Sequence, residues 1–369
     1  METDDAVDEV AREVILEHPA IYDVRVIAPS FADSDGDPVC VPLDAEAAFE
    51  RWNYADGAGL LETCAGEGLS IAEVFYRREQ ALRTMQGVTA EVGPYLRRVL
   101  EVMRAAATGP VERPVASTGG LIGGEARKMA LACGDGAPVL DPLAARAAVY
   151  ALAVLETNAA MGRIVATPTA GSAGVLPAVL IPLYWRENLL EEKMLEAMFT
   201  ASGVGAVIAY RACISGAAGG CQAEIGSASA MAAAALVHLR GGSESQICHA
   251  VAMALKNLMG LACDPVAGLV EVPCIKRNVV GAVNAVAAAD MALAGIESRI
   301  PADEVIDAMG EVGRRLPMEL RETALGGLAA TPTGRAVKER MASSKKKQRV
   351  LTIKDARWRL EKREPQEGK

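Results

Sequence analysis

Basic charge, aromatic side chains and histidine are all scarce in this chain. It has 38 lysines and arginines against 47 aspartates and glutamates, a formal net charge of -9. Because contact with phosphate groups needs a basic surface, nucleic acid is excluded as the main partner. Aromatic residues make up 4% of the sequence while alanine and glycine are abundant, which favours close-packed helices over a β-sandwich.

Targeting and membrane signals are also missing. The N-terminus METDDAVDEV is acidic and has no apolar core, so it does not predict a secretory signal. The apolar runs at residues 230–237 and 279–295 are too short or too polar to span a bilayer, which predicts buried helices and no membrane association. The eight cysteines are scattered along the chain, which favours a reducing, cytoplasmic location.

Charge divides the sequence into three parts. Residues 1–50 contain fourteen acidic residues and two arginines, with a β-like alternation at residues 22–30, and we expect an acidic N-terminal extension with room for β structure. Residues 51–340 carry helical periodicity and form the predicted catalytic domain. Residues 341–369 form a predicted basic C-terminal tail. Both extensions are either solvated or make an intersubunit contact.

Apolar residues recur at helical spacing through the central part. The predicted fold class is therefore mainly α: a multi-helix domain whose glycine-rich loops converge on one site. Helices are expected at residues 71–85, 92–106, 142–158, 187–212, 226–239, 243–263 and 280–296.

Three cysteines interrupt this helical pattern. Cys221 ends the glycine-rich turn SGAAGGC, Cys263 precedes an Asp-Pro pair, and Cys274 follows a proline. Their spacing of 42 and then 11 residues matches no local zinc or ferredoxin pattern, but thiolates at the ends of broken helices can converge on one metal centre. Three such ligands would leave one metal position open for substrate. The alternative is that all three are small buried side chains of an alanine-rich core.

Two irregular stretches are candidate substrate-binding segments. STGGLIGGEA begins at Ser117 and leads into a helical segment, so its N–H groups and the hydroxyls of Ser117 and Thr118 suit a small carboxylate. It lacks the lysine of a nucleotide-binding loop. Prolines and glycines break the apolar residues 161–180 after Asn158, which indicates either a ligand cavity or a junction between helices.

Several long blocks resemble a single family. NAAMGRIVATPTAGSAG, SGAAGGCQAEIGSASAMAAAA, LKNLMGLACDPVAGLVEVPCIKRN and LRETALGGLAATPTG resemble the alpha chain of the bacterial iron-sulfur-dependent L-serine dehydratases. The resemblance implies a 4Fe-4S cluster held by Cys221, Cys263 and Cys274. It also implies elimination of water from L-serine, which gives pyruvate and ammonia and belongs to amino-acid catabolism and gluconeogenesis.

The same resemblance implies further site residues. Ser117, Thr118, Gly119 and Asn158 would orient the substrate carboxylate and amine. Lys276 and Arg277, next to Cys274, would supply positive charge, and simple salt bridges are an equal alternative for both.

A partner chain is expected because of a histidine motif. The family's beta part carries a Ser-His-Thr motif followed by glycine, which none of the three histidines, His18, His238 and His249, matches. We therefore expect a separate beta subunit or an unusual replacement for this histidine. A homo-oligomer is expected in addition to the beta subunit or in its place. The catalytic base is unknown, and the beta subunit is its candidate source.

Three other functions are compatible with parts of this pattern. The same fold and cluster would serve a cysteine desulfidase or a threonine deaminase. A non-catalytic cluster-bearing subunit would explain the absent histidine motif. A pyridoxal-phosphate dehydratase is disfavoured because Lys256 lies in an apolar helix without a phosphate-binding motif beside it.

Overall fold

The computed structural model describes residues 43–88, 92–136 and 138–343. Within these ranges every regular element is a helix, and extended pairing is limited to isolated bridges between Ala116 and Gly123 and between Cys263 and Arg321. The predicted mainly α fold is confirmed. The β-like residues 22–30 lie outside the described residues, as do most of both predicted extensions, so those boundaries stay predictions.

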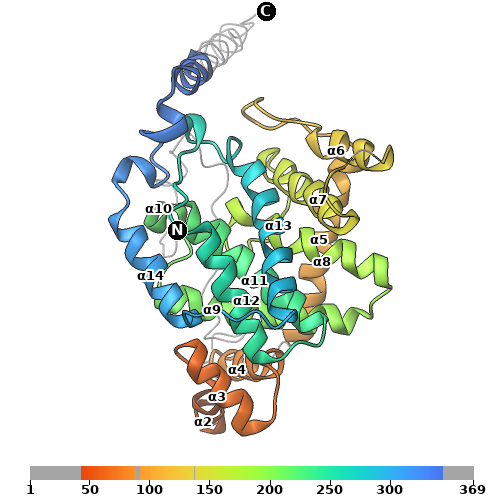
Figure 1. The fold of residues 1–369 in the computed structure, drawn as a ribbon, viewed down its shortest axis with the longest axis vertical. Helices are drawn as coiled ribbons and strands as arrows, with labels where there is room; N and C mark the ends of the chain where they lie inside the picture. Colours follow the sequence, from red (N-terminus) through yellow and green to blue (C-terminus); the bar gives the residue numbers. More distant parts are fainter. Residues whose placement is uncertain (1–42, 89–91, 137, 344–369) are drawn as a thin grey trace, which may run out of the picture. The chain divides into compact units, whose positions relative to one another are not determined.

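A helix at residues 332–343 ends the described part of the chain, and the other helices are labelled in Figure 1. They are α2 (Leu43–Trp52), α3 (Gly57–Glu67), α4 (Ile71–Met85), α5 (Val92–Glu112), α6 (Glu125–Gly134), α7 (Pro142–Ala159), α8 (Val175–Glu187), α9 (Glu191–Arg211), α10 (Gly216–Gly219), α11 (Ser227–Leu239), α12 (Glu244–Leu258), α13 (Cys274–Leu293) and α14 (Ala302–Arg315). Short 3-10 or π turns are η1 (Ala170–Ser172), η2 (Gln222–Gly226), η3 (Val266–Gly268), η4 (Met318–Leu320) and η5 (Gly327–Ala330).

The chain forms two compact units. Among the described residues, the smaller contains 43–52, 77–88 and 92, and the larger contains 53–76, 93–136 and 138–343. In the smaller unit the guanidinium of Arg77 lies 5.0 Å from the ring centroid of Trp52, a cation–π contact. The candidate site belongs entirely to the larger unit.

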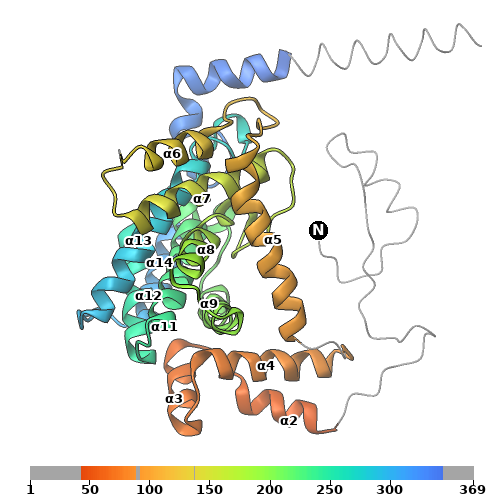
Figure 2. The same cartoon turned by 90° about the vertical axis from the view of Figure 1, so that its right-hand side faces the viewer.

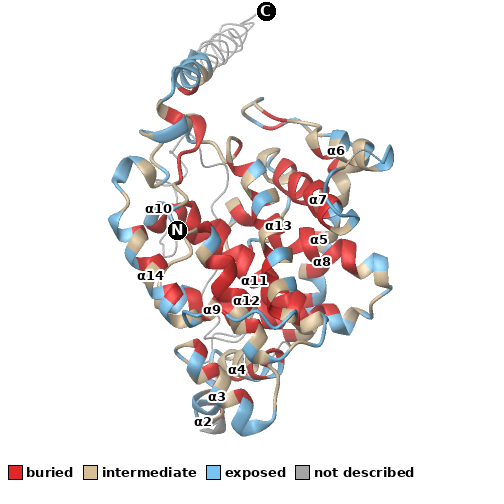
Figure 3. Ribbon diagram, in the orientation of Figure 1, coloured by how far each residue is buried: buried red, intermediate tan, exposed pale blue. Residues whose placement is uncertain are grey.

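Helix α11 is the centre of the larger unit. It packs against α8, α9, α12 and α13 (Figures 1 and 2), and it is buried at every position from Ser227 to Val237. Its alanines let the neighbouring helices approach closely, and a helix that is apolar all round belongs in a core. Figure 3 shows the resulting concentration of buried residues along α11 and α12. Cys221 and the η2 turn lead into the N-terminal end of this central helix.

Several helix ends differ from the expectation. Helix α5 continues to Glu112 rather than residue 106, and α9 begins at Glu191 rather than residue 187 because residues 175–187 form α8. The two differences that bear on the cysteines concern α12 and α13. Helix α12 begins as expected, with a Ser243 capping box, but it ends at Leu258 and does not reach Cys263. Gly260 has a left-handed φ of 87°, and its N–H donates to Gln222 Oε1 at 2.8 Å, which stops the helix. Helix α13 begins at Cys274 rather than near residue 280, because the polar residues after Cys274 belong to its first turns.

No helix within the described ranges combines the length and apolarity that a membrane span requires.

Candidate metal centre

Cys221 is held in place by a tight glycine turn. Gly220 has a φ of 75°, and a Cβ there would lie 2.9 Å from the carbonyl oxygen of Leu261, so the position requires glycine. Gln222 N–H donates to the same oxygen at 2.9 Å. Cys221 is 1% exposed and stands at the start of η2, a π turn, and such turns are frequent at functional sites.

Cys263 lies in an extended segment rather than a helix. Its N–H donates to Leu320 O at 2.8 Å, and its carbonyl oxygen accepts from Glu322 N–H at 2.7 Å. The closing block of the sequence thus fixes Cys263 on both sides of its backbone. Cys263 is 2% exposed.

Cys274 is the first residue of α13 and is also buried. The Sγ atoms of Cys221 and Cys263 and a carboxylate oxygen of Glu224 all lie within 4.8 Å of one another, and Cys274 lies outside this set. The negative charges of Cys221 and Glu224 nevertheless contribute to raising the pKa of Cys274, after burial. The three predicted cysteines therefore share one buried region, and two of them are in close approach.

Arg277 connects the cysteines electrostatically. Its Nη1 donates to Cys221 Sγ at 3.3 Å and to Ala262 O at 2.6 Å, and its Nη2 donates to Asp264 Oδ1 at 2.8 Å. Burial alone would lower the pKa of Arg277, but the charges of Cys221 and Asp264 raise it. The guanidinium is therefore a permanent positive charge beside the sulfur atoms.

The two close sulfur atoms have opposite proton affinities. The hydrogen bond with Cys263 and the charge of Arg277 lower the pKa of Cys221 against the effect of burial. The hydrogen bond with Cys221 and burial raise the pKa of Cys263. Of the pair, Cys221 therefore gives up its proton more readily than Cys263, and metal binding would release any proton that the two thiols hold.

Glu224 was not among the residues predicted from the sequence. Its carboxylate accepts from Thr169 Oγ1 at 2.6 Å, and Thr169 caps η1. Burial raises the pKa of Glu224. Its position three residues after Cys221 places both on one face of a helical turn, and this spacing is the signal that identifies it.

The 117–121 loop already holds a carboxylate of the chain itself. Ser117 Oγ donates to Glu271 Oε2 at 2.6 Å, Gly119 N–H donates to Glu271 Oε1 at 2.7 Å, and Leu121 N–H donates to Oε2 at 3.2 Å. Glu271 is 2% exposed and lies three residues before Cys274. The loop therefore binds the carboxylate of Glu271, where the sequence predicted a small-molecule carboxylate, and so contacts the segment that carries Cys274.

The other predicted substrate-binding residues point elsewhere. Thr118 is exposed, and its hydroxyl donates to Ala159 O at 2.9 Å. Asn158 Nδ2 donates to Ala170 O at 3.2 Å, next to Thr169. Lys276 is exposed and pairs with Glu125 at 2.7 Å. Of the six predicted substrate-binding residues, Arg277 is the one that a hydrogen bond within the described ranges joins directly to a cysteine sulfur.

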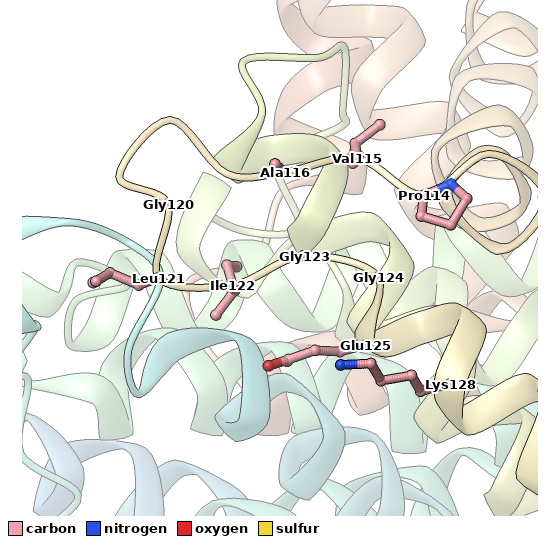
Figure 4. Close-up of a pocket in the computed structure, with 10 residues that line it drawn as sticks. All are labelled: Pro114, Val115, Ala116, Gly120, Leu121, Ile122, Gly123, Gly124, Glu125 and Lys128. Atoms are coloured by element: carbon pink, nitrogen blue, oxygen red, sulfur yellow. The ribbon is translucent and has the colours of Figure 1, made fainter.

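An open pocket lies on the outer side of the same glycine-rich loop (Figure 4). It has a volume of about 500 Å³ and is lined by loop residues together with Glu125 and Lys128 of α6. None of the three cysteines lines it. The pocket is therefore separate from the sulfur atoms, although both involve the segment around residue 120.

Comparison with known proteins places this geometry in a family. The family model of the serine dehydratase alpha chain matches residues 66–329. The chain is 50% identical over 282 residues to the probable L-serine dehydratase alpha chain of Bacillus subtilis (strain 168), covering 76% of this chain and 93% of that protein. It is 41% identical over 279 residues to the L-serine dehydratase alpha chain of Peptoniphilus asaccharolyticus, covering 76% of this chain and 95% of that protein.

A longer relative is matched over only part of its length. L-serine dehydratase 2 of Escherichia coli (strain K12) is 39% identical over 312 residues, which cover 81% of this chain and 64% of that protein. The matched region contains the three cysteines, Glu224 and the 117–121 loop. By the extent of the family match and by these identities, the chain belongs to the serine dehydratase alpha chain family.

Proposed function

We propose that this chain is the alpha subunit of an iron-sulfur-dependent L-serine ammonia-lyase, which eliminates water from L-serine and yields pyruvate and ammonia. The observation that carries the proposal is the approach of Cys221 and Cys263 to one another, beside Arg277 and close to Cys274, in a member of the serine dehydratase alpha chain family.

The donor set fits an iron-sulfur cluster. Cys221, Cys263 and Cys274 would hold a 4Fe-4S cluster, since iron-sulfur clusters are bound by cysteine thiolates in buried surroundings. Arg277 offsets the negative charge that the thiolates bring into the interior. When bound, the cluster would supply an iron without a cysteine ligand, a Lewis acid that polarises the bond to the departing hydroxyl group.

The chain's own residues hold this site rigid and exclude water. Backbone bonds with residues 320–322 fix Cys263, and Asp264 orients Arg277. The substrate must lose a proton from Cα and hydroxide from Cβ, and the resulting enamine converts to pyruvate and ammonia in water. We propose that the beta subunit supplies the base that takes the α-proton.

Substrate binding by the predicted residues depends on Glu271. Ser117 and Gly119 donate to Glu271, so these donors reach a substrate carboxylate only if Glu271 releases them. Thr118 and Asn158 donate to Ala159 O and Ala170 O, so they would orient the substrate carboxylate and amine only after releasing these partners. Arg277 supplies positive charge near the sulfur atoms, and Lys276 does so from the exposed surface, where it pairs with Glu125.

The proposed partner is a beta chain. Two relatives named alpha chain are covered over more than nine tenths of their length, whereas the Escherichia coli enzyme has a further part that this chain does not match. We propose that a beta chain supplies the equivalent of that part, with or without association of further alpha chains. The free cysteines and a cluster both favour a reducing compartment such as the cytoplasm.

A product assay tests this function. The chain and its beta partner are reconstituted anaerobically with iron and sulfide and are then supplied with L-serine, L-threonine or L-cysteine. Pyruvate from serine supports the proposal. By contrast, 2-oxobutanoate from threonine indicates a threonine deaminase, and sulfide from cysteine indicates a cysteine desulfidase. A bound cluster without any product would make the chain a non-catalytic cluster-bearing subunit.

A further inference from the structure

Glu224 places a carboxylate oxygen beside two of the three proposed cysteine ligands. One of its carboxylate oxygens lies within 4.8 Å of both Cys221 Sγ and Cys263 Sγ. The side chain is 9% exposed, so it is not a solvent-facing acid that happens to lie near a cysteine. A buried carboxylate next to two sulfur atoms is costly unless a cation or a proton compensates it.

The surrounding backbone is shaped around this carboxylate. A Cβ on Gly171 would lie 2.9 Å from Glu224 Oε1, and a Cβ on Gly216 would lie 2.8 Å from Oε2 and 3.1 Å from Cys263 Sγ. Thr169 Oγ1 donates to Oε1 at 2.6 Å and so fixes the orientation of the group. Two glycines and one hydroxyl therefore hold the carboxylate against the sulfur atoms.

The charge around Glu224 is incompletely balanced within the described residues. Arg277 donates to Cys221, Ala262 and Asp264, and within the described residues no hydrogen bond or ion pair joins it to Glu224. Glu322 adds a negative charge that acts on Glu224. A metal ion at this position would supply the missing positive charge.

We propose that Glu224 is the oxygen ligand of the iron that the three cysteines leave uncoordinated. This inference rests on the proposed function, since it presupposes the cluster. The carboxylate occupies that iron in the absence of substrate and exchanges with an oxygen atom of the amino acid when substrate binds. The exchange replaces one oxygen ligand by another and needs no oxidant or reductant.

The test compares the cluster in the wild-type chain and in Glu224→Gln after anaerobic reconstitution with isotopically enriched iron. In the wild type, the Mössbauer spectrum should contain one iron site distinct from the others. In Glu224→Gln this site should change its signal, and mild oxidation should convert the cluster to the three-iron form about tenfold faster. Electron paramagnetic resonance follows that conversion without any activity measurement.

Glu322→Gln is the matched control. It also removes a negative charge that acts on Glu224 and Cys263, but the residue is exposed. Its cluster should lose iron at the wild-type rate if ligation, rather than charge, is responsible. A Glu322→Gln chain that loses iron as fast as Glu224→Gln overturns the inference.

A second variant covers the case in which Glu224→Gln does not fold. Gly171→Ala keeps the carboxylate but displaces it, and it should accelerate loss of the same iron. Unchanged spectra and rates in a folded Glu224→Gln chain, or in Gly171→Ala if Glu224→Gln is unfolded, overturn the inference and leave the proposed function intact. A folded Glu224→Gln chain that takes up no iron at all also overturns it, because the role would not be specific to one iron. If the wild type itself takes up no cluster, the proposed function fails as well.

Discussion

Glu271 and Glu224 are both buried carboxylates of the larger unit, but their surroundings differ. Glu271 accepts hydrogen bonds from Ser117, Gly119 and Leu121, so its charge is distributed over three donors. Within the described part of the chain, Thr169 is the side-chain donor to Glu224, whose other neighbours include sulfur atoms. A carboxylate with a full set of donors stabilises the fold, whereas one with few donors beside thiols is available to a metal.

The largest expected effect is loss of the cluster, which we predict for a substitution at the cysteines but not for one at Glu271. Cys263→Ala removes one of the sulfur atoms next to Glu224, and we expect iron and sulfide bound after anaerobic reconstitution to fall to background. Glu271 is not a cluster ligand in our proposal, so Glu271→Gln should retain a cluster. A Cys263→Ala chain with full iron content would remove Cys263 from the ligand set.

The same amide substitution should have different effects at the two carboxylates. In Glu271→Gln an amide NH₂ must face a donor of the 117–121 loop, so the free energy of unfolding of the metal-free protein should fall by on the order of 1–3 kcal/mol. Because burial raises the pKa of Glu224, its charge is unfavourable there, and Glu224→Gln should be neutral or stabilising. Urea unfolding measures both, and equal losses would contradict the comparison.

Substitution of Cys64, a buried cysteine outside the proposed ligand set, should have a smaller effect, limited to stability. Cys64 lies in α3, and burial raises its pKa to about 12, so it is an inert thiol. Cys64→Ala should lower the free energy of unfolding by about 1 kcal/mol through lost packing and leave iron uptake unchanged. Loss of the cluster in this variant would show that iron uptake reports stability rather than ligation. The same tolerance is predicted for Cys40, which lies outside the described residues, and for Cys133, Cys213 and Cys248.

The smallest effect concerns a third buried carboxylate, Glu156 of α7. Its Oε1 accepts from Glu125 N–H and Ala126 N–H, and burial raises its pKa above the ordinary value of 4.5. The folded state therefore holds this proton more tightly than the unfolded state, and the resulting stabilisation is complete below the unfolded pKa and is lost as pH rises through the folded pKa.

Glu156→Gln tests this dependence. The wild type should lose stability relative to Glu156→Gln as the pH rises from about 4.5, the ordinary value for the group. Urea midpoints at several pH values measure the difference. A difference that stays constant or changes in the opposite direction would contradict the assignment.

Periodicity predicted most helices because their apolar faces are regular. The helix expected at residues 71–85 has those bounds, and the one expected at 142–158 ends one residue later. The start of α13 was missed because Lys276, Arg277 and Asn278 interrupt the apolar pattern. These residues are helical, and Asn278 is buried because it bonds to Gly171 O and Gly174 N–H.

Part of the candidate site was also predictable from local sequence patterns. Breaks in helical periodicity identified the three cysteines, and glycine enrichment identified the 117–121 loop. The occupant of that loop was not predictable, since Glu271 lies 154 residues from Ser117 and no local pattern links them. Glu224 was missed because the spacing of three residues from Cys221 is its one sequence signal, and a single acidic residue among small residues forms no periodic pattern.

Visible absorption during a serine titration tests the central claim most directly. The claim is that the cysteines and Glu224 form one centre to which L-serine has access. After anaerobic reconstitution with the beta chain present, added L-serine should perturb the absorption of the cluster at saturating concentration, and Glu224→Gln should alter that response. A cluster whose spectrum is unchanged by L-serine in the wild type would contradict the account.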